Sequence, residues 1–435
     1  MRALVIGYVW PEPASSAAGT RMLELVQLLV RMGYEVTFAS AAALSEHRFD
    51  LNTLGVTEQS IALNCSSFDE FVGRLQPDLV LFDRFFTEEQ FGWRVEQSCP
   101  NALRILDTED LHSLRHARQQ LLKSAQKNCA SEKEKHSVAP VAADSEQLYQ
   151  QMCAGDMAVR EVAAIFRCDI SLMISEFEIE LLQRYFSVPS QLLFYCPFLS
   201  QPEMDVASLP DFSSRQHFIA IGNFRHEPNW DSVLWLKHQL WPMIRARLST
   251  VGMAQAELHI YGAYPPPKAT QLHNAKEGFH IKGWAADAQA VMQSARVCLA
   301  PLRFGAGIKG KLMDAMRCGT PSITTSIGVE SMSGRLPWGG TVADDAEAFV
   351  TAAVAHYQDE TLWQQKQPQG FSILRDYFYR RNHALALQAR LIELLHNLQY
   401  ERGDNFIGQM LRHHFHKSTQ YMGQWIEAKS KKPLQ

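Results

Sequence analysis

The chain has 435 residues, of which 46% are hydrophobic and 20% charged, and its formal net charge is −4. This length predicts more than one domain, and the composition is that of an ordinary globular protein. Because the chain is slightly acidic, its overall charge argues against nucleic-acid binding, and any site for anions must be a local cluster of cations.

The cysteines and the amino terminus indicate the compartment. The eight cysteines are dispersed and none forms a Cys-x-x-Cys pair, which argues against zinc ribbons and redox motifs. The short apolar run after Met1 ends at Pro11, so it predicts a buried strand and not a signal peptide. No segment approaches the roughly 18 continuous apolar residues that a membrane-spanning helix needs. We therefore expect a cytoplasmic protein.

The first 200 residues alternate between apolar strands and amphipathic helices. A strand at 3–9, a helix at 21–33 and a strand at 34–40 form a βαβ unit, which implies a parallel sheet. Alternating helices and strands follow at 68–76, 77–83, 87–99, 102–110, 158–167, 168–175, 176–186 and 192–198. Residues 1–205 are thus predicted to form a Rossmann-like domain.

The segment 118–152 interrupts this pattern. It is charged, rich in alanine and serine, and almost free of large apolar residues, so it predicts a mobile insertion or a partly frayed helix. A polar stretch with prolines at 201–216 then predicts a linker.

A second α/β series fills residues 213–370 and predicts a second Rossmann-like domain. Its strands are expected at 217–224, 256–262, 279–284, 296–302 and 320–326, and its helices at 230–248, 268–275 and 287–295. The predicted fold class is therefore α/β, with two doubly wound domains facing each other across a cleft. Since ligands bind such sheets beyond the carboxyl ends of the strands, we expect both binding edges to face that cleft.

Residues 371–435 predict C-terminal helices that pack back on the domains. Apolar residues recur at helical spacing in 380–398 and in 404–429. The second of these also carries histidines and lysines, so peripheral contact with a membrane surface stays open as the alternative for the helix at 404–428.

The most informative motif is "APLRFGAGIKGKLMDAMRCGTP", which begins at Ala300. A strand ends, Gly305, Gly307 and Gly310 remove side chains from the turn, and a helix begins near Gly310. The start of a helix offers unpaired amides and about half a positive charge, and nearby cations, namely Arg303, Lys309 and Lys311, add to it. This pattern predicts a binding site for two adjacent phosphates. The alternative is that the glycines only form a tight turn and the lysines lie on the solvent-exposed surface.

Two common nucleotide motifs are missing. The loop is not a Walker loop, because Leu312 follows Lys311 where that motif has Ser or Thr. The first strand–helix turn lacks the Gly-x-Gly-x-x-Gly motif, which disfavours a dehydrogenase.

The strand at 102–110 ends in a run of ionisable residues and leads to His112. A histidine there can donate a hydrogen bond to a sugar hydroxyl or relay a proton, although a role in starting the next helix stays open. His112 and His116 have a metal-compatible spacing, but the ligand set is incomplete and we predict no metal.

These motifs resemble the donor-binding half of GT-B glycosyltransferases of the family 4 type (glycosyl transferases group 1). The similar stretches include "FIAIGNFRHEPNW", "LHIYG", "IKGWAADAQ" and the Gly-x-Gly-x-Lys-Gly-Lys…Ala-Met-x-Cys-Gly-x-Pro run, and the likeness covers most of residues 1–395. The insertion and the final helix lie outside it.

The resemblance implies roles for individual residues. Lys309 would contact the donor diphosphate, Arg225 would be its cationic partner, and His112 would contact the donor sugar. Asp314 stands where the family has a glutamate on the ribose, and Ala306 replaces a second glutamate. The remaining donor-binding positions are Gly19 (phosphates), Gly283 and Trp284 (nucleobase), and the backbone of Gly305 to Gly307 in place of the missing glutamate.

The resemblance therefore implies a hexosyl-type glycosyltransferase (EC 2.4). It would move a sugar from a UDP- or GDP-linked donor to a glycan, lipid or protein acceptor, with retention, without a metal and without a permanently bound cofactor. Three alternatives stay open: a sugar-nucleotide 2-epimerase, a sugar-nucleotide hydrolase and a non-catalytic nucleotide-sugar-binding subunit.

Overall fold

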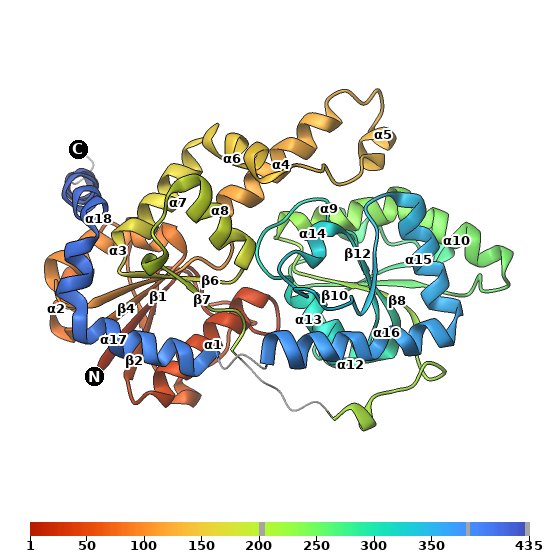
Figure 1. The fold of residues 1–435 in the computed structure, drawn as a ribbon, viewed down its shortest axis with the longest axis horizontal. Coiled ribbons are helices and arrows are strands. Elements are labelled where there is room, and N and C mark those ends of the chain that lie inside the picture. Colours follow the sequence, from red (N-terminus) through yellow and green to blue (C-terminus); the bar gives the residue numbers. More distant parts are fainter. Residues whose placement is uncertain (200–204, 380–382, 431–435) are drawn as a thin grey trace.

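The computed structural model describes residues 1–199, 205–379 and 383–430. It contains two separate parallel β-sheets, each packed against helices, as Figure 1 shows. The predicted α/β class with two doubly wound domains is confirmed.

The first sheet has the strand order β3-β2-β1-β4-β5-β6-β7. Its strands are β1 (Arg2–Gly7), β2 (Glu35–Ser40), β3 (Thr57–Ser60), β4 (Leu79–Asp83), β5 (Leu103–Asp107), β6 (Ile170–Met173) and β7 (Leu193–Tyr195). The strand order reverses between β1 and β4, which is the point where ligands bind in doubly wound sheets.

Side chains alternate across this sheet, so β1 contributes to two cores. Ala3 and Val5 join the core on one face, whereas Leu4 and Ile6 join the core on the other. The helices around the sheet are α1 (Ala17–Arg31), α2 (Ser67–Leu75), α3 (Arg84–Ser98), α7 (Asp156–Arg167) and α8 (Glu176–Phe186).

The second sheet has the order β10-β9-β8-β11-β12-β13 and reverses between β8 and β11. Its strands are β8 (Gln216–Ile221), β9 (Leu258–Tyr261), β10 (Phe279–Gly283), β11 (Ala295–Ala300), β12 (Ser322–Thr324) and β13 (Gly340–Val342). The helices that pack around it include α9 (Glu227–Trp235), α10 (Trp241–Thr250), α12 (Ala288–Ser294), α13 (Gly310–Arg317), α15 (Ala346–Gln358) and α16 (Glu360–Ser372).

The helix predicted at 230–248 is one continuous rod with a wider turn in its middle. A π-helical stretch, η4 (Leu236–Leu240), joins α9 to α10. Pro242 lies two residues after it and has no amide hydrogen to continue the α-helical bonding, which accounts for the irregular turn. The helix predicted at 268–275 is shorter than expected, because only α11 (Pro267–Thr270) forms.

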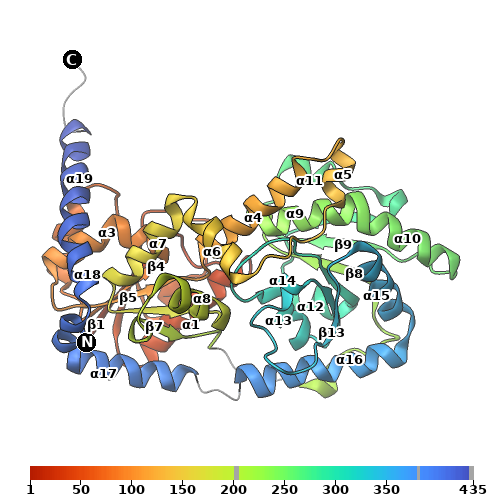
Figure 2. The same cartoon turned by 45° about the horizontal axis from the view of Figure 1, so that its top comes forward.

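The segment 118–152 is built from helices in the structure. These are α4 (His112–Gln126), α5 (Glu132–Ser137) and α6 (Ser145–Cys153), and Figure 2 shows α5 extending from α4 towards α9. Leu122, Leu148 and Met152 are buried, so the ends of the segment belong to the first domain's packing. Its middle extends to the second domain.

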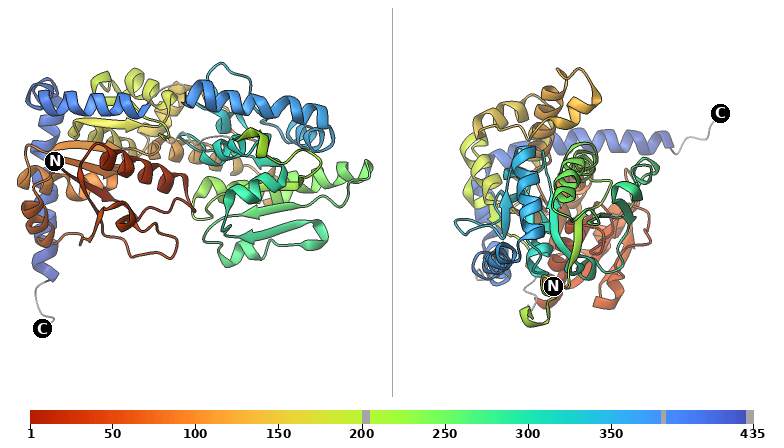
Figure 3. Two further views of the ribbon diagram at one scale, coloured as in Figure 1. Left: turned by 90° about the horizontal axis from the view of Figure 1, so that it is seen from below. Right: turned by 90° about the vertical axis from the view of Figure 1, so that its right-hand side faces the viewer.

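The chain returns to the first domain after α16. Figure 3 shows α16 and α17 (His383–Asp404) following one another along one side of the molecule. Leu387, Leu391, Leu394 and Leu398 of α17 are buried in the same core as Ala3 and the strands beside it. Three further helical segments follow: α18 (Phe406–Leu411), η7 (Arg412–His416) and α19 (Lys417–Ser430).

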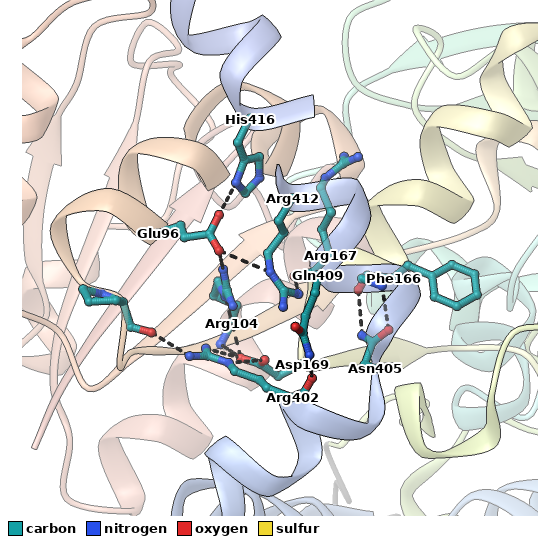
Figure 4. Close-up of polar contacts among 12 residues, drawn as sticks. Glu96, Arg104, Phe166, Arg167, Asp169, Arg402, Asn405, Gln409, Arg412 and His416 are labelled. Carbon is teal, nitrogen blue, oxygen red and sulfur yellow. Dashed lines mark hydrogen bonds and ion pairs between the residues drawn. The ribbon is translucent and has the colours of Figure 1, made fainter. Parts of the chain in front are cut away.

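Ion pairs hold these last helices on the first domain, as Figure 4 shows. Arg402 pairs with Asp169 at 2.7 Å, and Arg412 Nε lies 3.2 Å from Glu96 Oε1. His416 contacts the same Glu96 carboxylate through Nδ1. No helix among the described residues is long and apolar enough to cross a membrane.

Candidate active site

The glycine loop, residues 303–309, connects β11 to α13. Gly307 adopts a left-handed conformation, with φ 64°, which a residue with a side chain rarely takes. Lys309 stands at the N-cap of α13 and its own side chain does not cap the helix, while its amide donates to Met332 Sδ at 3.4 Å. The predicted arrangement of strand, glycine loop and helix start is present, and it leaves the positive end of α13 available to an anion.

The start of α1 meets the start of α13 across the two domains. A Cβ built at Gly310 would lie 2.6 Å from the Cβ of Ala17. The amino-terminal ends of α1 and α13, which carry partial positive charge, therefore lie next to each other. Gly19 lies in the first turn of α1, where its amide donates to Ser16 Oγ at 3.0 Å and where a Cβ would meet the backbone of Glu12 at 2.5 Å. The absence of a side chain at Gly19 thus lets the loop that contains Glu12 pack directly against the start of α1.

Two lysines border the glycine loop and face different groups. Lys309 is buried, and its Nζ donates to the carbonyl oxygen of Gly307 at 2.7 Å. Lys311 Nζ donates to Asn229 Oδ1 at 2.6 Å, and a Cβ at Gly222 would lie 2.9 Å from that nitrogen. Burial lowers the pKa of both ammonium groups to about 8. Such groups gain from a bound anion, because it compensates the cost of burying their charge.

Arg303, the third cation of the motif, has a structural role. It forms a two-pronged ion pair with Asp231, at 2.6 and 2.9 Å. It also donates to the carbonyl oxygens of Val138 and Lys135, at 3.0 and 3.3 Å. Arg303 therefore fastens the segment after α5 to the second domain, and its charge is already compensated.

Arg225 follows β8 in the same domain as the glycine loop, three residues after Gly222, where a Cβ would lie 2.9 Å from Lys311 Nζ. Its guanidinium lies 3.7 Å from the centre of the Tyr264 ring, and its amide donates to Asn223 Oδ1 at 2.9 Å. The Tyr264 hydroxyl donates to Glu12 Oε1 of the first domain at 2.8 Å. Arg225 is exposed, so its side chain is accessible to a ligand in the cleft.

The predicted nucleobase position holds an aromatic stack in this structure. Gly283 ends β10 with φ 76°, and Trp284 follows it with 41% of its surface exposed. His47 of the first domain stacks on Trp284, with ring centres 4.6 Å apart and an angle of 16° between the planes. A planar ring thus occupies the face of Trp284 that the resemblance assigns to a base.

Asp314, the predicted ribose contact, lies in the second turn of α13. Its side chain is 45% exposed and pairs with Arg317 at 3.0 Å, one turn further along the same helix. The carboxylate is held in place by this pair and still has exposed surface for a hydroxyl group.

Buried acids gather at the carboxyl end of β5. Asp107 is fully buried and pairs with Arg21 of α1 at 2.7 Å. Glu109 is also buried and has a left-handed backbone, with φ 60°, while its Oε1 has no hydrogen-bond partner among the described residues. Burial, aided by the charge of Asp107, raises the pKa of Glu109 well above its usual range. Burial thus favours the protonated form of the Glu109 carboxyl group, which can donate a hydrogen bond.

His112 begins α4 and is neutral across the working pH range. Burial lowers its pKa to about 3, in spite of Asp110, whose Oδ1 lies 3.5 Å from His112 Nε2. The ring packs edge-on against Phe85 and Phe86, with centres 5.8 and 5.3 Å apart. A fixed, neutral imidazole suits a hydrogen bond to a sugar hydroxyl better than a charged role.

The glycine loop is also held from the first domain. Glu178 Oε1, in α8, accepts from the Gly307 amide at 2.8 Å, and Arg118 Nη1 donates to the Gly305 carbonyl at 2.8 Å. Arg118 in turn pairs with Glu330 at 2.6 Å. In this structure the two domains are in contact, and the Gly307 amide already donates its hydrogen bond to the carboxyl group of Glu178.

Sequence reasoning did not single out Glu178, Arg118 or Asn229. Glu109 belongs to the run of ionisable residues at the end of the strand predicted at 102–110, where chemistry was expected, but it was given no role of its own. Lys311 was visible in the motif as one of its cations. Glu178 and Arg118 carried no local signal, because their roles come from docking against the other domain.

The comparisons with known proteins agree with this geometry. Residues 215–359 match the family described as glycosyl transferases group 1. This range covers β8 to α15 and includes the glycine loop and both lysines. No curated protein sequence matches the chain.

Solved structures match nearly the whole chain at low identity. Sucrose-phosphate synthase from Thermosynechococcus elongatus is 16% identical with a TM-score of 0.57, and the match covers 91% of this chain and 99% of that one. WaaG, a glycosyltransferase involved in lipopolysaccharide biosynthesis, is 11% identical with a TM-score of 0.58, over 90% and 99% of the two chains. HepE from Anabaena, solved with UDP and glucose, is 11% identical with a TM-score of 0.57, over 91% and 99%. The chain therefore has the GT-B fold, and residues 215–359 of its second domain match the model of the group 1 glycosyl transferases.

Proposed function

We propose that this protein transfers a sugar from a nucleoside diphosphate sugar to an acceptor held by the first domain. The observation that carries the proposal is the meeting of the α1 and α13 helix starts at Ala17 and Gly310. Beside them lie the buried Lys309 and the partly buried Lys311, both of lowered pKa. A diphosphate supplies the two adjacent negative charges that such a place favours.

Donor binding requires the glycine loop to leave the first domain. The Gly307 amide now donates to Glu178, and Lys309 Nζ donates to the Gly307 carbonyl. A phosphate oxygen would replace both partners. We therefore expect the donor to enter an opened cleft, which closes again over it and excludes water, since hydrolysis is the competing reaction.

In the transfer step, the bond between the anomeric carbon and the β-phosphate oxygen breaks, and the acceptor oxygen bonds to that carbon and loses its proton. Charge grows on the leaving diphosphate. Lys309, Arg225 and the start of α13 would stabilise it, a role worth about 10²–10³ in turnover for one such group. Retention of configuration, hexosyl transfer and independence of a metal belong to this proposal, as does the family 4 type.

The sugar and the base would lie on either side of the diphosphate. His112 suits a hydrogen bond to a sugar hydroxyl, as does Glu109 in its protonated form, and Asp314 suits the ribose. A base would stack on Trp284 in the place that His47 occupies. HepE was solved with UDP, which supports UDP as the first nucleotide to test, and GDP as the second.

The acceptor is proposed to be a glycan, a lipid or a protein, and the location cytoplasmic. Tyr421, Met422 and Trp425 of α19 are exposed, at 59–66%, which supports peripheral contact with a membrane surface. Such contact would bring a lipid-linked acceptor to the enzyme.

One observation favours a second candidate, a non-catalytic nucleotide-sugar-binding subunit. Ala306 replaces a glutamate of the family, and the neighbouring Gly307 amide is engaged by Glu178. Incubation with a panel of nucleotide sugars, with and without cell-extract acceptors, separates the candidates. A transferase gives product only when an acceptor is present, whereas a 2-epimerase isomerises its donor alone and a hydrolase releases free sugar. For a non-catalytic binding subunit, UDP or GDP would raise the protein's melting temperature and no nucleotide sugar would be consumed.

A further inference from the structure

We propose that the second domain carries a zinc site formed by His217, Glu257, His259 and His280, at the far end of its sheet from the glycine loop. His217, Glu257 and His259 offer ligand atoms that all lie within 4.8 Å of one another. The proposal is independent of the transfer reaction and stands on this cluster alone.

The sheet brings the four side chains to one face. His259 of β9 is the register partner of His280 in β10 and of Ile219 in β8. Partners in adjacent parallel strands point to the same face, and so do residues two apart in one strand. Glu257 is two before His259 and so shares its face. His217 has a left-handed backbone, with φ 62°, and its ring is placed beside Glu257 and His259 by direct contacts.

The carboxylate of Glu257 is the centre of the cluster. Its Oε2 lies 2.7 Å from His259 Nε2 and 3.9 Å from His217 Nε2, and its Oε1 lies 3.4 Å from His280 Nε2. Zinc bonds to nitrogen and oxygen are about 2.0–2.1 Å, so two ligands of a tetrahedral ion lie about 3.3 Å apart. The observed oxygen–nitrogen distances lie on both sides of that value, and small side-chain movements would bring all four ligand atoms to bonding distance of one ion.

The site is accessible and only partly buried. The side chains of His217, His259 and His280 are 28%, 20% and 13% exposed. His217 and His259 also line a hollow of about 220 Å³, together with Gln216 and Tyr261. An ion can therefore enter from solvent, while the strands hold its ligands in place.

Binding has a defined consequence for His217. Its Nδ1 accepts a hydrogen bond from the Glu257 amide at 3.2 Å, which keeps the proton of the neutral ring on Nε2. A zinc ion needs the lone pair of Nε2, so the proton moves to Nδ1 and the bond from the amide breaks. Imidazole and carboxylate ligands suit Zn²⁺ and exclude a preference for Mg²⁺ or Ca²⁺, which take oxygen ligands.

The test is zinc titration of the full chain, freed of any affinity tag and stripped with a chelator. Calorimetry should show one zinc ion per chain, and titration with Co²⁺ should give the visible bands of a tetrahedral site. His259→Ala and Glu257→Gln should each weaken zinc binding by more than about 100-fold, since loss of an outer partner alone costs 10–100-fold. Glu257→Gln keeps the shape of the side chain, so it reports on binding even if His259→Ala folds poorly.

His414→Ala is the matched control, because His414 is exposed on the tail and outside the cluster. It should bind zinc as the unchanged protein does. Nitrogen NMR of the histidines should show the His217 proton moving from Nε2 to Nδ1 on zinc addition. Unchanged zinc binding in both His259→Ala and Glu257→Gln, or a loss in His414→Ala alone, would overturn the proposal and assign the ion to the tail histidines.

Discussion

Adding one methyl group at Gly310 tests whether the contact between the α1 and α13 helix starts belongs to the working state. The new Cβ would lie 2.6 Å from the Cβ of Ala17, whereas carbon atoms in contact lie about 3.5–4.0 Å apart. The two helix starts must therefore separate by about 1 Å. A displacement of that size at a reacting centre costs about 100-fold in rate, or roughly 2.7 kcal/mol of transition-state stabilisation.

The expected result for Gly310→Ala is a loss of about 100-fold in kcat/KM for sugar transfer, measured with whichever donor and acceptor the panel identifies. The affinity for the free nucleotide should change far less, because the second domain binds it in the open state. Stability should not fall, since alanine favours a helix by about 1 kcal/mol over glycine. The double variant Ala17→Gly, Gly310→Ala removes the clash and should recover most of the lost rate.

Gly403→Ala is the control for the substitution itself. Gly403 also lies in a helix, and a Cβ there would meet nothing within 4 Å. Normal transfer by Gly310→Ala, or a loss that Ala17→Gly does not recover, would show that this contact plays no part in turnover.

Four further predictions address single groups. Lys309→Ala should lower turnover by about 10²–10³-fold, and near-normal turnover would refute a role at the diphosphate. His112→Ala should lower transfer while nucleotide affinity in calorimetry survives, and loss of both would indicate a structural histidine. Burial, aided by the charge of Asp110, raises the pKa of Glu178 to about 8 from an ordinary 4.5, so the folded state loses stability as the pH rises from about 4.5 to 8. Glu178→Gln should flatten that part of the stability profile in urea unfolding, and an unchanged slope would contradict the assignment. Burial opposes the charging of His416, but the Glu88 carboxylate, 3.8 Å from Nε2, and the hydrogen bond to Glu96 outweigh it and raise the pKa. The contribution of His416 to docking of α19 is therefore complete below about pH 6.5 and is lost as the pH rises through the higher folded value. After correction for the intrinsic pH dependence of amide hydrogen exchange, exchange in α19 should become faster as the pH rises across that range. In His416→Gln the corrected exchange rate should no longer change with pH.

Local patterns in the sequence were sufficient for the two sheets. Strands such as β1 and β4 have apolar runs, Ala3–Ile6 and Leu79–Phe82, and the helices between them are amphipathic, so each element could be predicted from its own residues. The edge strands β3 and β13 were missed because they are short, and β3 (Thr57–Ser60) is polar and only partly buried, with no apolar run to mark it. The glycine loop was also predictable, since the strand end, the glycines and the helix start are contiguous in the chain.

The tertiary structure alone decided what each charged group near that loop does. Arg303, Lys309 and Lys311 look equivalent in the sequence, but Arg303 is neutralised by Asp231, Lys309 bonds to the loop, and Lys311 reaches Asn229 of α9. Glu178 lies 129 residues from the Gly307 amide that it binds, and Ala17 is further still from Gly310. Such pairs carry no spacing that a sequence pattern can show, because they form only when two independently folded sheets dock, and the geometry of that docking sets the partners.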